Sequence, residues 1–105
     1  MIVQIHTNND VEGGEQLTTQ VEAIVSTAVA RFADRISRVQ VHLGDENSST
    51  KRGSNDKRCM IEARIDGAAP VAVTELAPSI ELAVNGAAGK LERSLDSRLG
   101  RRRDH

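Results

Sequence analysis

The amino-acid sequence predicts an α+β fold with the element order β-α-β-β-β-α, in which a four-stranded mixed sheet carries two helices on one face. Two long stretches repeat apolar residues every three or four positions, and four short stretches are β-branched or alternate apolar with polar residues. At 105 residues the chain has the size of a single domain. We expect this domain to span residues 1–99 and a basic tail to occupy residues 100–105.

The first strand and the first helix are predicted within residues 2–33. Residues 2–6 (IVQIH) are β-branched, and the polar residues 7–10 that follow indicate a turn. A helix is expected from about Glu15 to about Ala33, because apolar residues recur there at helical spacing. These residues are Leu17, Val21, Ile24, Val25, Ala28 and Phe32.

The next three strands are predicted to form an antiparallel meander. Residues 39–43 alternate apolar and polar side chains, as do residues 58–65, and residues 71–73 (VAV) follow the Asp66–Gly67 turn signal. Residues 44–57 contain no apolar side chain, which predicts a solvated loop. The first helix should connect the first two strands as parallel neighbours, in the right-handed sense.

The second helix is predicted to begin near Pro78, which suits a first helical turn. Gly86 and Gly89 lie within it and should let it approach the sheet closely, and Gly100 is a plausible stop. Its apolar stripe consists of Leu76, Ile80, Val84, Ala87, Leu91, Leu95 and Leu99.

Positive charge gathers at the end of the chain. Residues 90–105 hold six Lys or Arg against three acids, whereas residues 1–89 carry a formal charge of −4. On a helical projection Lys90, Arg93 and Arg101 form one stripe beside the buried leucines. The basic residues are expected either to form a solvated face and tail or to contact nucleic-acid phosphates. The candidates for phosphate contact are Arg31, Arg35, Arg38, Lys57, Arg58, Lys90, Arg93, Arg98, Arg101 and Arg102.

The composition excludes or disfavours several other functions. Phe32 is the only aromatic residue among Phe, Tyr and Trp, so a platform that stacks splayed bases has little material. The single Cys59 allows no internal disulfide and is most simply a small buried apolar residue. No signal segment or membrane-spanning run is evident, which indicates a cytoplasmic domain. No catalytic arrangement stands out by spacing, so we expect no enzyme, cofactor or small-molecule substrate.

Two more specific hypotheses concern the sheet and duplex RNA. His6 and His42 are expected side by side on the open sheet face, where together with Glu62 they could bind a metal. Two exposed histidines without a metal are the commoner explanation, and we expect no metal site. Double-stranded RNA-binding domains share the general layout but place lysines at the start of their second helix. Residues 78–89 contain no base, which counts against that mode of binding.

Several segments resemble one known family, in order and at the expected element ends. The most specific are residues 31–36 (RFADRI) and 90–95 (KLERSL), supported by residues 3–6 (VQIH), 39–43 (VQVHL) and 80–83 (IELA). In these segments the chain resembles the ribosome hibernation-promoting factor and ribosome-associated inhibitor family. It resembles a short, single-domain, divergent member, with about four additional residues around Gly86–Gly89 and no base between Gln16 and Ala30.

The resemblance implies a translation inhibitor that binds the small ribosomal subunit in the channel for mRNA and tRNA, in stationary or stressed bacterial cells. It places Arg31, Arg35, Lys90 and Arg93 on a basic helical surface that contacts ribosomal RNA, and Arg98 with the tail extends it. It also implies a short form without a dimerisation domain, which we expect to be a monomer. The alternative is a protein-interaction module that uses the open sheet face; a small enzyme is a more distant alternative.

Overall fold

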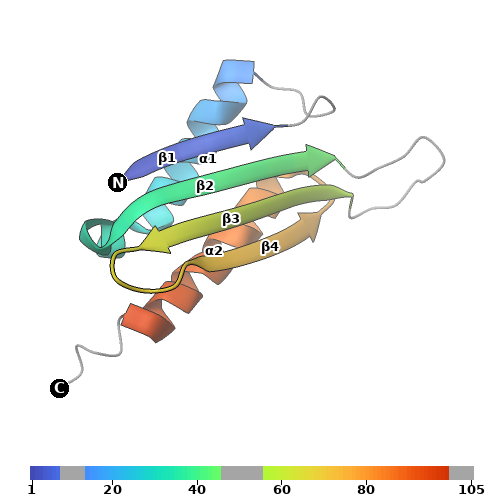
Figure 1. Ribbon diagram of the computed structural model, residues 1–105. Coiled ribbons are helices and arrows are strands. Elements are labelled where there is room, and N and C mark those ends of the chain that lie inside the picture. Colours follow the sequence, from blue (N-terminus) through green and yellow to red (C-terminus); the bar gives the residue numbers. More distant parts are fainter. Residues whose placement is uncertain (8–13, 46–55, 100–105) are drawn as a thin grey trace.

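The computed structural model describes residues 1–7, 14–45 and 56–99 and has the predicted element order (Figure 1). A 3₁₀ helix (η1) adds one short element between the first helix and the second strand. The elements are β1 (Ile2–Thr7), α1 (Gly14–Ala28), η1 (Ala30–Arg35), β2 (Ile36–Asp45), β3 (Lys57–Ile65), β4 (Val71–Ala77) and α2 (Ile80–Leu99).

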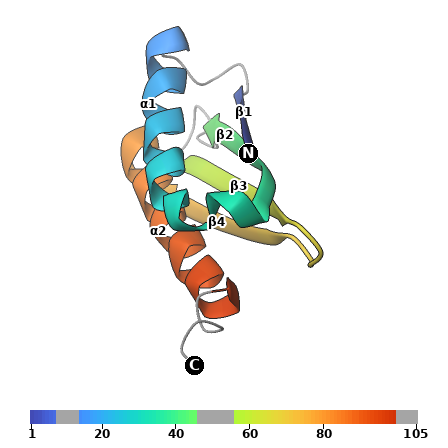
Figure 2. The same ribbon diagram turned by 90° about the vertical axis from the view of Figure 1, so that its left-hand side faces the viewer.

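The four strands form one sheet in the order β1-β2-β3-β4. β1 pairs with β2 in parallel, whereas β2–β3 and β3–β4 are antiparallel. Both helices cover the same face of the sheet, and the opposite face carries no helix (Figures 1 and 2). The predicted α+β class, strand pairing and layering are therefore confirmed.

The core lies between the sheet and the two helices. Along β2 and β3 the side chains alternate, so that every second residue is buried against the helices. The largest side chains that are fully buried include Ile61, Leu91 and Leu95. None of the buried residues is polar or charged within the described part of the chain, so the charged groups available for function lie at the surface.

The predicted helix over residues 15–33 is wrong at its C-terminal end, because the α-helix stops at Ala28. The chain then tightens into η1, in which the Phe32 amide donates to the Val29 carbonyl at 2.9 Å. This turn buries both Val29 and Phe32, which are 0% and 4% exposed. The free energy gained by burying the Phe32 ring outweighs the free energy of continuing the regular α-helix.

The start of the second helix also differs from the prediction. Leu76 was expected on the helical stripe, but it belongs to β4, pairs with Arg58 and is 46% exposed. The helix begins at Ile80, where the Ser79 hydroxyl accepts a hydrogen bond from the Leu82 amide at 3.2 Å. Ser79 therefore caps the helix, and Pro78 precedes this cap instead of lying in the first turn.

The strand bounds differ from the prediction in the same direction, because each strand is longer than its alternating run. Gly44 and Asp45 extend β2 and Lys57 belongs to β3, although all three lie in the stretch predicted as a loop. Residues 46–55 and Gly100 lie outside the described residues. No helix in the described part of the chain is long and apolar enough to cross a membrane.

The small residues of α2 allow the close approach that the sequence predicted. Ala83 and Ala87 are completely buried against the sheet. A Cβ atom placed on Gly86 would lie 2.7 Å from Cγ of Glu75 on β4, which is closer than two carbon atoms can pack. Gly86 thus leaves room for the Glu75 side chain beneath the helix.

Candidate nucleic-acid interface

The basic residues predicted to contact phosphates divide between the two faces of the molecule. One set lies on η1 and α2, in the helical layer, and we call it the helical surface: Arg31, Arg35, Lys90, Arg93 and Arg98. Arg38 and Arg58 lie instead on the opposite, open face of the sheet. Lys57 lies at the start of β3, and Arg101 and Arg102 lie outside the described residues.

Arg31 is held in place on the helical surface. Its guanidinium lies over the Phe32 ring, 4.6 Å from the ring centroid, and forms an ion pair of 3.3 Å with Asp96 of α2. Both members of the pair are about half exposed, so the pair itself contributes little stability. It nevertheless orients the guanidinium across the junction between η1 and α2.

Lys90 points back toward the sheet. Its ammonium donates to the Thr74 carbonyl at 2.8 Å and pairs with the Glu75 carboxylate at 2.8 Å, both on β4. Lys90 therefore fastens α2 to β4, and its charge is largely satisfied within the protein. The predicted stripe of free positive charge is reduced accordingly.

Arg35, Arg93 and Arg98 remain the more available cations of the helical surface, because within the described residues none of their side chains forms an ion pair. Arg93 is exposed and forms no hydrogen bond or ion pair within residues 1–7, 14–45 and 56–99. The Arg98 guanidinium donates to the Ala69 carbonyl in the turn after β3, at a long 3.5 Å. The η1 helix, the start of β2, the end of β3 and the end of α2 lie at the same end of the molecule (Figure 1), so arginines concentrate there.

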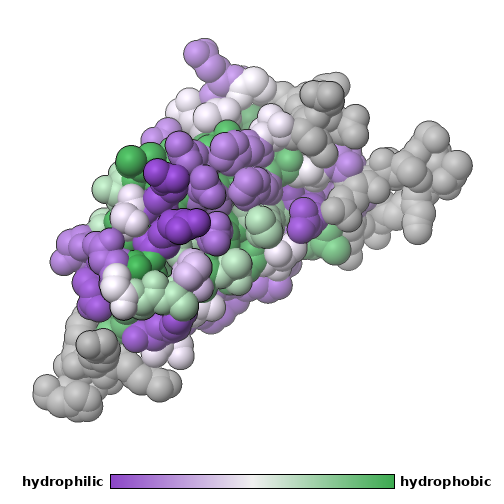
Figure 3. Space-filling view, viewed as in Figure 1, coloured by the Kyte–Doolittle hydropathy of each residue, from purple (hydrophilic) through white to green (hydrophobic). Residues whose placement is uncertain are grey.

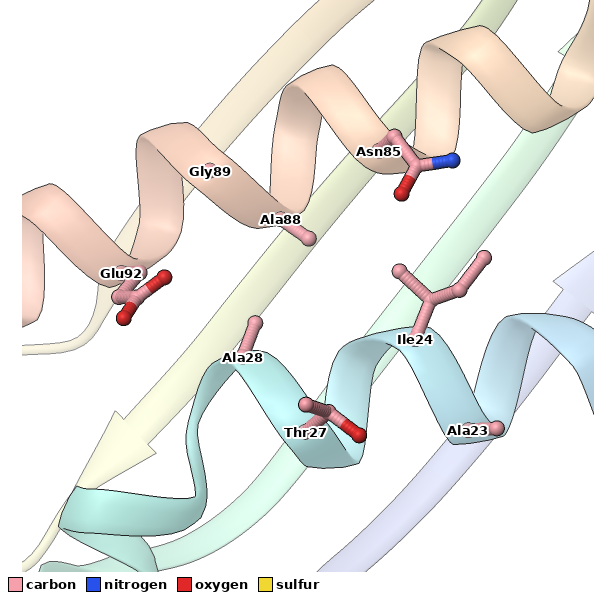
Figure 4. A pocket seen from close by; sticks show the side chains of 8 residues that line it. All are labelled: Ala23, Ile24, Thr27, Ala28, Asn85, Ala88, Gly89 and Glu92. Atoms are coloured by element: carbon pink, nitrogen blue, oxygen red, sulfur yellow. The ribbon is translucent and has the colours of Figure 1, made fainter.

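The groove between α1 and α2 has a different character. Ile24 and Ala28 point across it from α1, and Asn85, Ala88 and Glu92 face them from α2 (Figure 4). The groove has a volume of about 480 Å³, and its lining includes one carboxylate and no base. A phosphate would meet a negative charge there, so this groove is not part of a phosphate-binding surface.

Lys57 is neutralised by its neighbours at the opposite end of the sheet. Its ammonium lies 3.2 Å from the Asp56 carboxylate and 3.4 Å from that of Asp45. The hydrogen bond to Asp56, supported by Asp45, raises the pKa of Lys57 above 10.5 despite some desolvation. Two carboxylates around one ammonium leave no positive charge in excess at this position.

The strand register places four rows of side chains across the open sheet face. In the first row Ile2, Arg38 and Arg64 are aligned. In the next rows Gln40 donates to Gln4 at 3.0 Å, and the rings of His6 and His42 stack with centroids 4.8 Å apart. The fourth row contains Gly44, Arg58 and Leu76.

This face is hydrophilic over β1 to β3 and paler over β4 (Figure 3). It carries three arginines, namely Arg38, Arg58 and Arg64, against the single carboxylate of Glu62. The expected pairing of His6 with His42 is present. Within the described ranges no three His, Cys, Asp or Glu side chains are grouped so that they could hold a metal ion.

Cys59 is buried on the helix-facing side of β3, as the alternation predicted. Desolvation raises the pKa of its thiol to about 12, with a small opposing effect from Arg58. The thiol stays protonated at neutral pH, and because it is buried it takes no part in either basic face of the molecule.

Comparison with known families identifies the chain. Residues 3–103 match the family described as sigma 54 modulation protein / S30EA ribosomal protein. The chain belongs to this family. This family assignment confirms the resemblance to ribosome-associated factors seen in the sequence.

Two solved structures have the same fold as this S30EA family member. The N-terminal domain of Thermus thermophilus Protein Y has a TM-score of 0.72 at 19% identity, with 93% of this chain and 99% of that chain covered. A ribosomal subunit interface protein from Coxiella burnetii has a TM-score of 0.68 at 15% identity, covering 93% and 97%. No curated protein sequence matches.

One basic residue of the surface was missing from the sequence-based candidates. Arg64 lies on the open face, in register with Arg38. The alternation of β3 places it on the same side as Arg58, but only the strand register shows that it adjoins Arg38. A search for cross-strand pairs along the predicted meander could have found it.

Proposed function

We propose that this S30EA family member is a hibernation factor that inhibits translation by occupying the mRNA and tRNA channel of the small ribosomal subunit. The helical surface would face the ribosomal RNA, with Arg93 and Arg98 as its principal phosphate contacts. Such a partner would keep the protein in the cytoplasm. Family membership over residues 3–103 is the observation that carries this proposal.

The geometry supports contact with the RNA backbone and gives little support to base reading. Arginines are gathered at the end of the molecule where η1 and α2 meet, and phosphate oxygens are the natural partners of exposed guanidinium groups. The Asp96 carboxylate fixes Arg31 in this group. Lys90 would support the surface by anchoring α2.

The alternative of a protein-interaction module on the sheet receives no support from apolar surface. Ile2 and Leu76 are the large apolar side chains most exposed on that face, at 54% and 46%. They lie on β1 and β4, the two opposite edges of the sheet. Separated apolar residues do not form the continuous patch that a protein partner would bury.

The proposal is tested by co-sedimentation with purified small ribosomal subunits over a series of salt concentrations. Each phosphate contact contributes about 0.7–0.9 to the slope of log affinity against log salt. Replacing both residues in Arg93→Ala/Arg98→Ala should therefore weaken binding and reduce the slope by about 1.5. Failure of the wild-type protein to sediment with the subunit at low salt would contradict the proposal.

The matched control keeps the positive charges at both positions and replaces the planar guanidinium groups with ammonium groups. Arg93→Lys/Arg98→Lys should retain most of the salt dependence, since Lys still contacts phosphate as a point charge. Lys90→Ala provides the contrast, because it should lower the melting temperature by removing the contacts to β4. A variant set in which all three changes affect only stability would indicate that the helical surface does not contact RNA.

A further inference from the structure

The open sheet face carries an arrangement that the helical surface does not explain. Arg38 on β2 and Arg64 on β3 are directly opposite one another, both exposed and on the same face. Like charges in this position repel each other and destabilise a sheet. Within the described residues neither guanidinium has a hydrogen bond or an ion pair. The nearest carboxylate along the ladder, Glu62, is opposite Gln40 instead.

Two arginines at directly facing positions, whose side chains have no partner among the described residues, offer a site for an anion. Each presents a planar fork of N–H donors that matches the oxygens of a phosphodiester. An anion between the two arginines would cancel the repulsion between their charges. Binding would therefore be favoured both by the loss of this repulsion and by the new hydrogen bonds. Arg58, two rows beyond the glutamine pair on the same face, extends the positive surface along the strands.

The rows between these arginines fit the rest of a nucleotide. The stacked rings of His6 and His42 form a small imidazole platform, and histidine is among the side chains on which unstacked bases rest. The Gln4 and Gln40 side chains lie between this platform and the arginine pair, where amides can bond to bases, sugars or phosphates. Phe, Tyr and Trp are absent here, but the histidine pair supplies a flat surface in their place.

We propose that the open sheet face binds a single strand of RNA, with Arg38 and Arg64 on its phosphates and the His6–His42 pair against its bases. The polar surface suits an unpaired strand whose bases are accessible, and its exposed large apolar side chains, Ile2 and Leu76, lie apart at opposite edges of the sheet. This binding is separate from the proposed helical contact with the ribosome. A protein with both surfaces would hold RNA on two opposite sides.

The test measures binding of fluorescein-labelled oligo(U) and oligo(A) 12-mers by anisotropy, between 50 and 200 mM salt. We expect wild-type protein to bind with a salt-dependent affinity, and Arg38→Gln/Arg64→Gln to reduce the slope by about 1.4, which corresponds to two phosphates of a single strand. His6→Ala/His42→Ala should weaken oligo(A) binding by about fivefold, the lower end for stacking on one base.

Two further variants separate charge from folding. Arg38→Lys/Arg64→Lys should retain most of the slope, because both charges remain. Arg64→Glu should abolish binding while raising the melting temperature, since it replaces the repulsion across β2 and β3 with an attraction. A loss of binding through unfolding would lower the melting temperature, so the two causes are distinguished in one measurement.

Several results would overturn the inference. These are no binding of either oligonucleotide at 50 mM salt, an unchanged slope in the Gln variant, tighter binding of a duplex RNA, or displacement by polyglutamate of equal charge. The last result would assign the face to an acidic peptide. None of them involves ribosomes, so co-sedimentation through the helical surface would remain a separate question.

Discussion

At the scale of single residues, the arginine pair on the open face predicts an unusual effect on stability. Arg64→Glu would place opposite charges at a directly facing position on β2 and β3. Cross-strand pairs of opposite charge contribute roughly 0.2–1 kcal/mol relative to neutral pairs, and like charges destabilise. We expect the free energy of unfolding to rise by about 1 kcal/mol, measured by urea denaturation at low salt. A gain that persists at 1 M salt would show another cause, because exposed charges are screened there.

A second residue, Cys59, predicts the behaviour of the protein at alkaline pH. Burial raises the pKa of this thiol to about 12 from 9.0. The unfolded chain can ionise above pH 9.0 while the native protein cannot, so stability is unaffected below that pH and falls as the pH rises toward 12. Between pH 8 and 10 the free energy of unfolding should decrease by about 1 kcal/mol from this group.

Cys59→Ala is the control for this prediction. It should be less stable at every pH because it leaves a small void, but it should lack this part of the pH dependence. Lys57 acts at higher pH than this thiol, because the hydrogen bond to Asp56 raises the pKa of its ammonium above the usual lysine value. Equal slopes for the two proteins would mean that the thiol ionises in the folded state.

At the scale of elements, the contact between α2 and β4 depends on the absence of a side chain at Gly86. Ala at this position would favour the helix by about 1 kcal/mol, but its Cβ would displace the Glu75 side chain from beneath the helix. Displacing Glu75 also removes the ion pair with Lys90. We therefore expect Gly86→Ala to change the stability of the wild-type protein by less than about 0.5 kcal/mol.

A double-mutant cycle separates the two opposing effects. In a Glu75→Ala background the obstacle is gone, and Gly86→Ala should stabilise the protein by about 0.5–1 kcal/mol. Thermal or urea unfolding of the four proteins measures the difference. An effect of Gly86→Ala that is the same with and without Glu75 would contradict the close contact.

The elements also show which parts of the fold the sequence could predict. The strands of the meander and the apolar face of α2 follow from periods of two and about 3.6 residues. The end of α1 cannot be predicted in this way, because the 3₁₀ turn that buries Phe32 keeps almost the same spacing of apolar residues as a continuing α-helix. Leu76 was misassigned because it fits both the helical stripe and an alternating strand. Only its pairing with Arg58 shows that it belongs to β4.

The candidate site was less predictable than the fold, because its basic side chains form ion pairs with acids on other elements of the fold. Lys90 meets Glu75 and Arg31 meets Asp96, pairs that are far apart in the sequence. A helical projection shows which face a base occupies but not whether an acid lies opposite it. Arg64 was overlooked for the same reason, since its neighbour is Arg38 on another strand.

At the scale of the whole molecule, the two basic surfaces lie on opposite sides of a two-layer domain (Figure 2). Changes at separated sites without shared contacts are usually additive. If both surfaces contact ribosomal RNA, Arg38→Gln/Arg64→Gln and Arg93→Ala/Arg98→Ala should each weaken co-sedimentation with small subunits. The protein with all four changes should lose the sum of the two salt slopes, about 3.

The pattern of losses indicates how the domain is placed on its partner. If the four-residue variant is no weaker than Arg93→Ala/Arg98→Ala, only the helical surface contacts the subunit. In that case the sheet face would be left exposed on the ribosome and free to bind another strand. Salt titrations of the wild type and the three variants on one preparation of subunits provide the comparison.

Among the described strands, β1 lies at the edge of the sheet and pairs with β2 alone. Gln4 and His6 reach the open face from this strand, whereas their partners Gln40 and His42 come from the interior of the sheet. A ligand that bridges these pairs would therefore stabilise the pairing of the N-terminal strand with β2. Bound ligand should slow the hydrogen exchange of the β1 amides, even where the exchange of the other amides is unchanged.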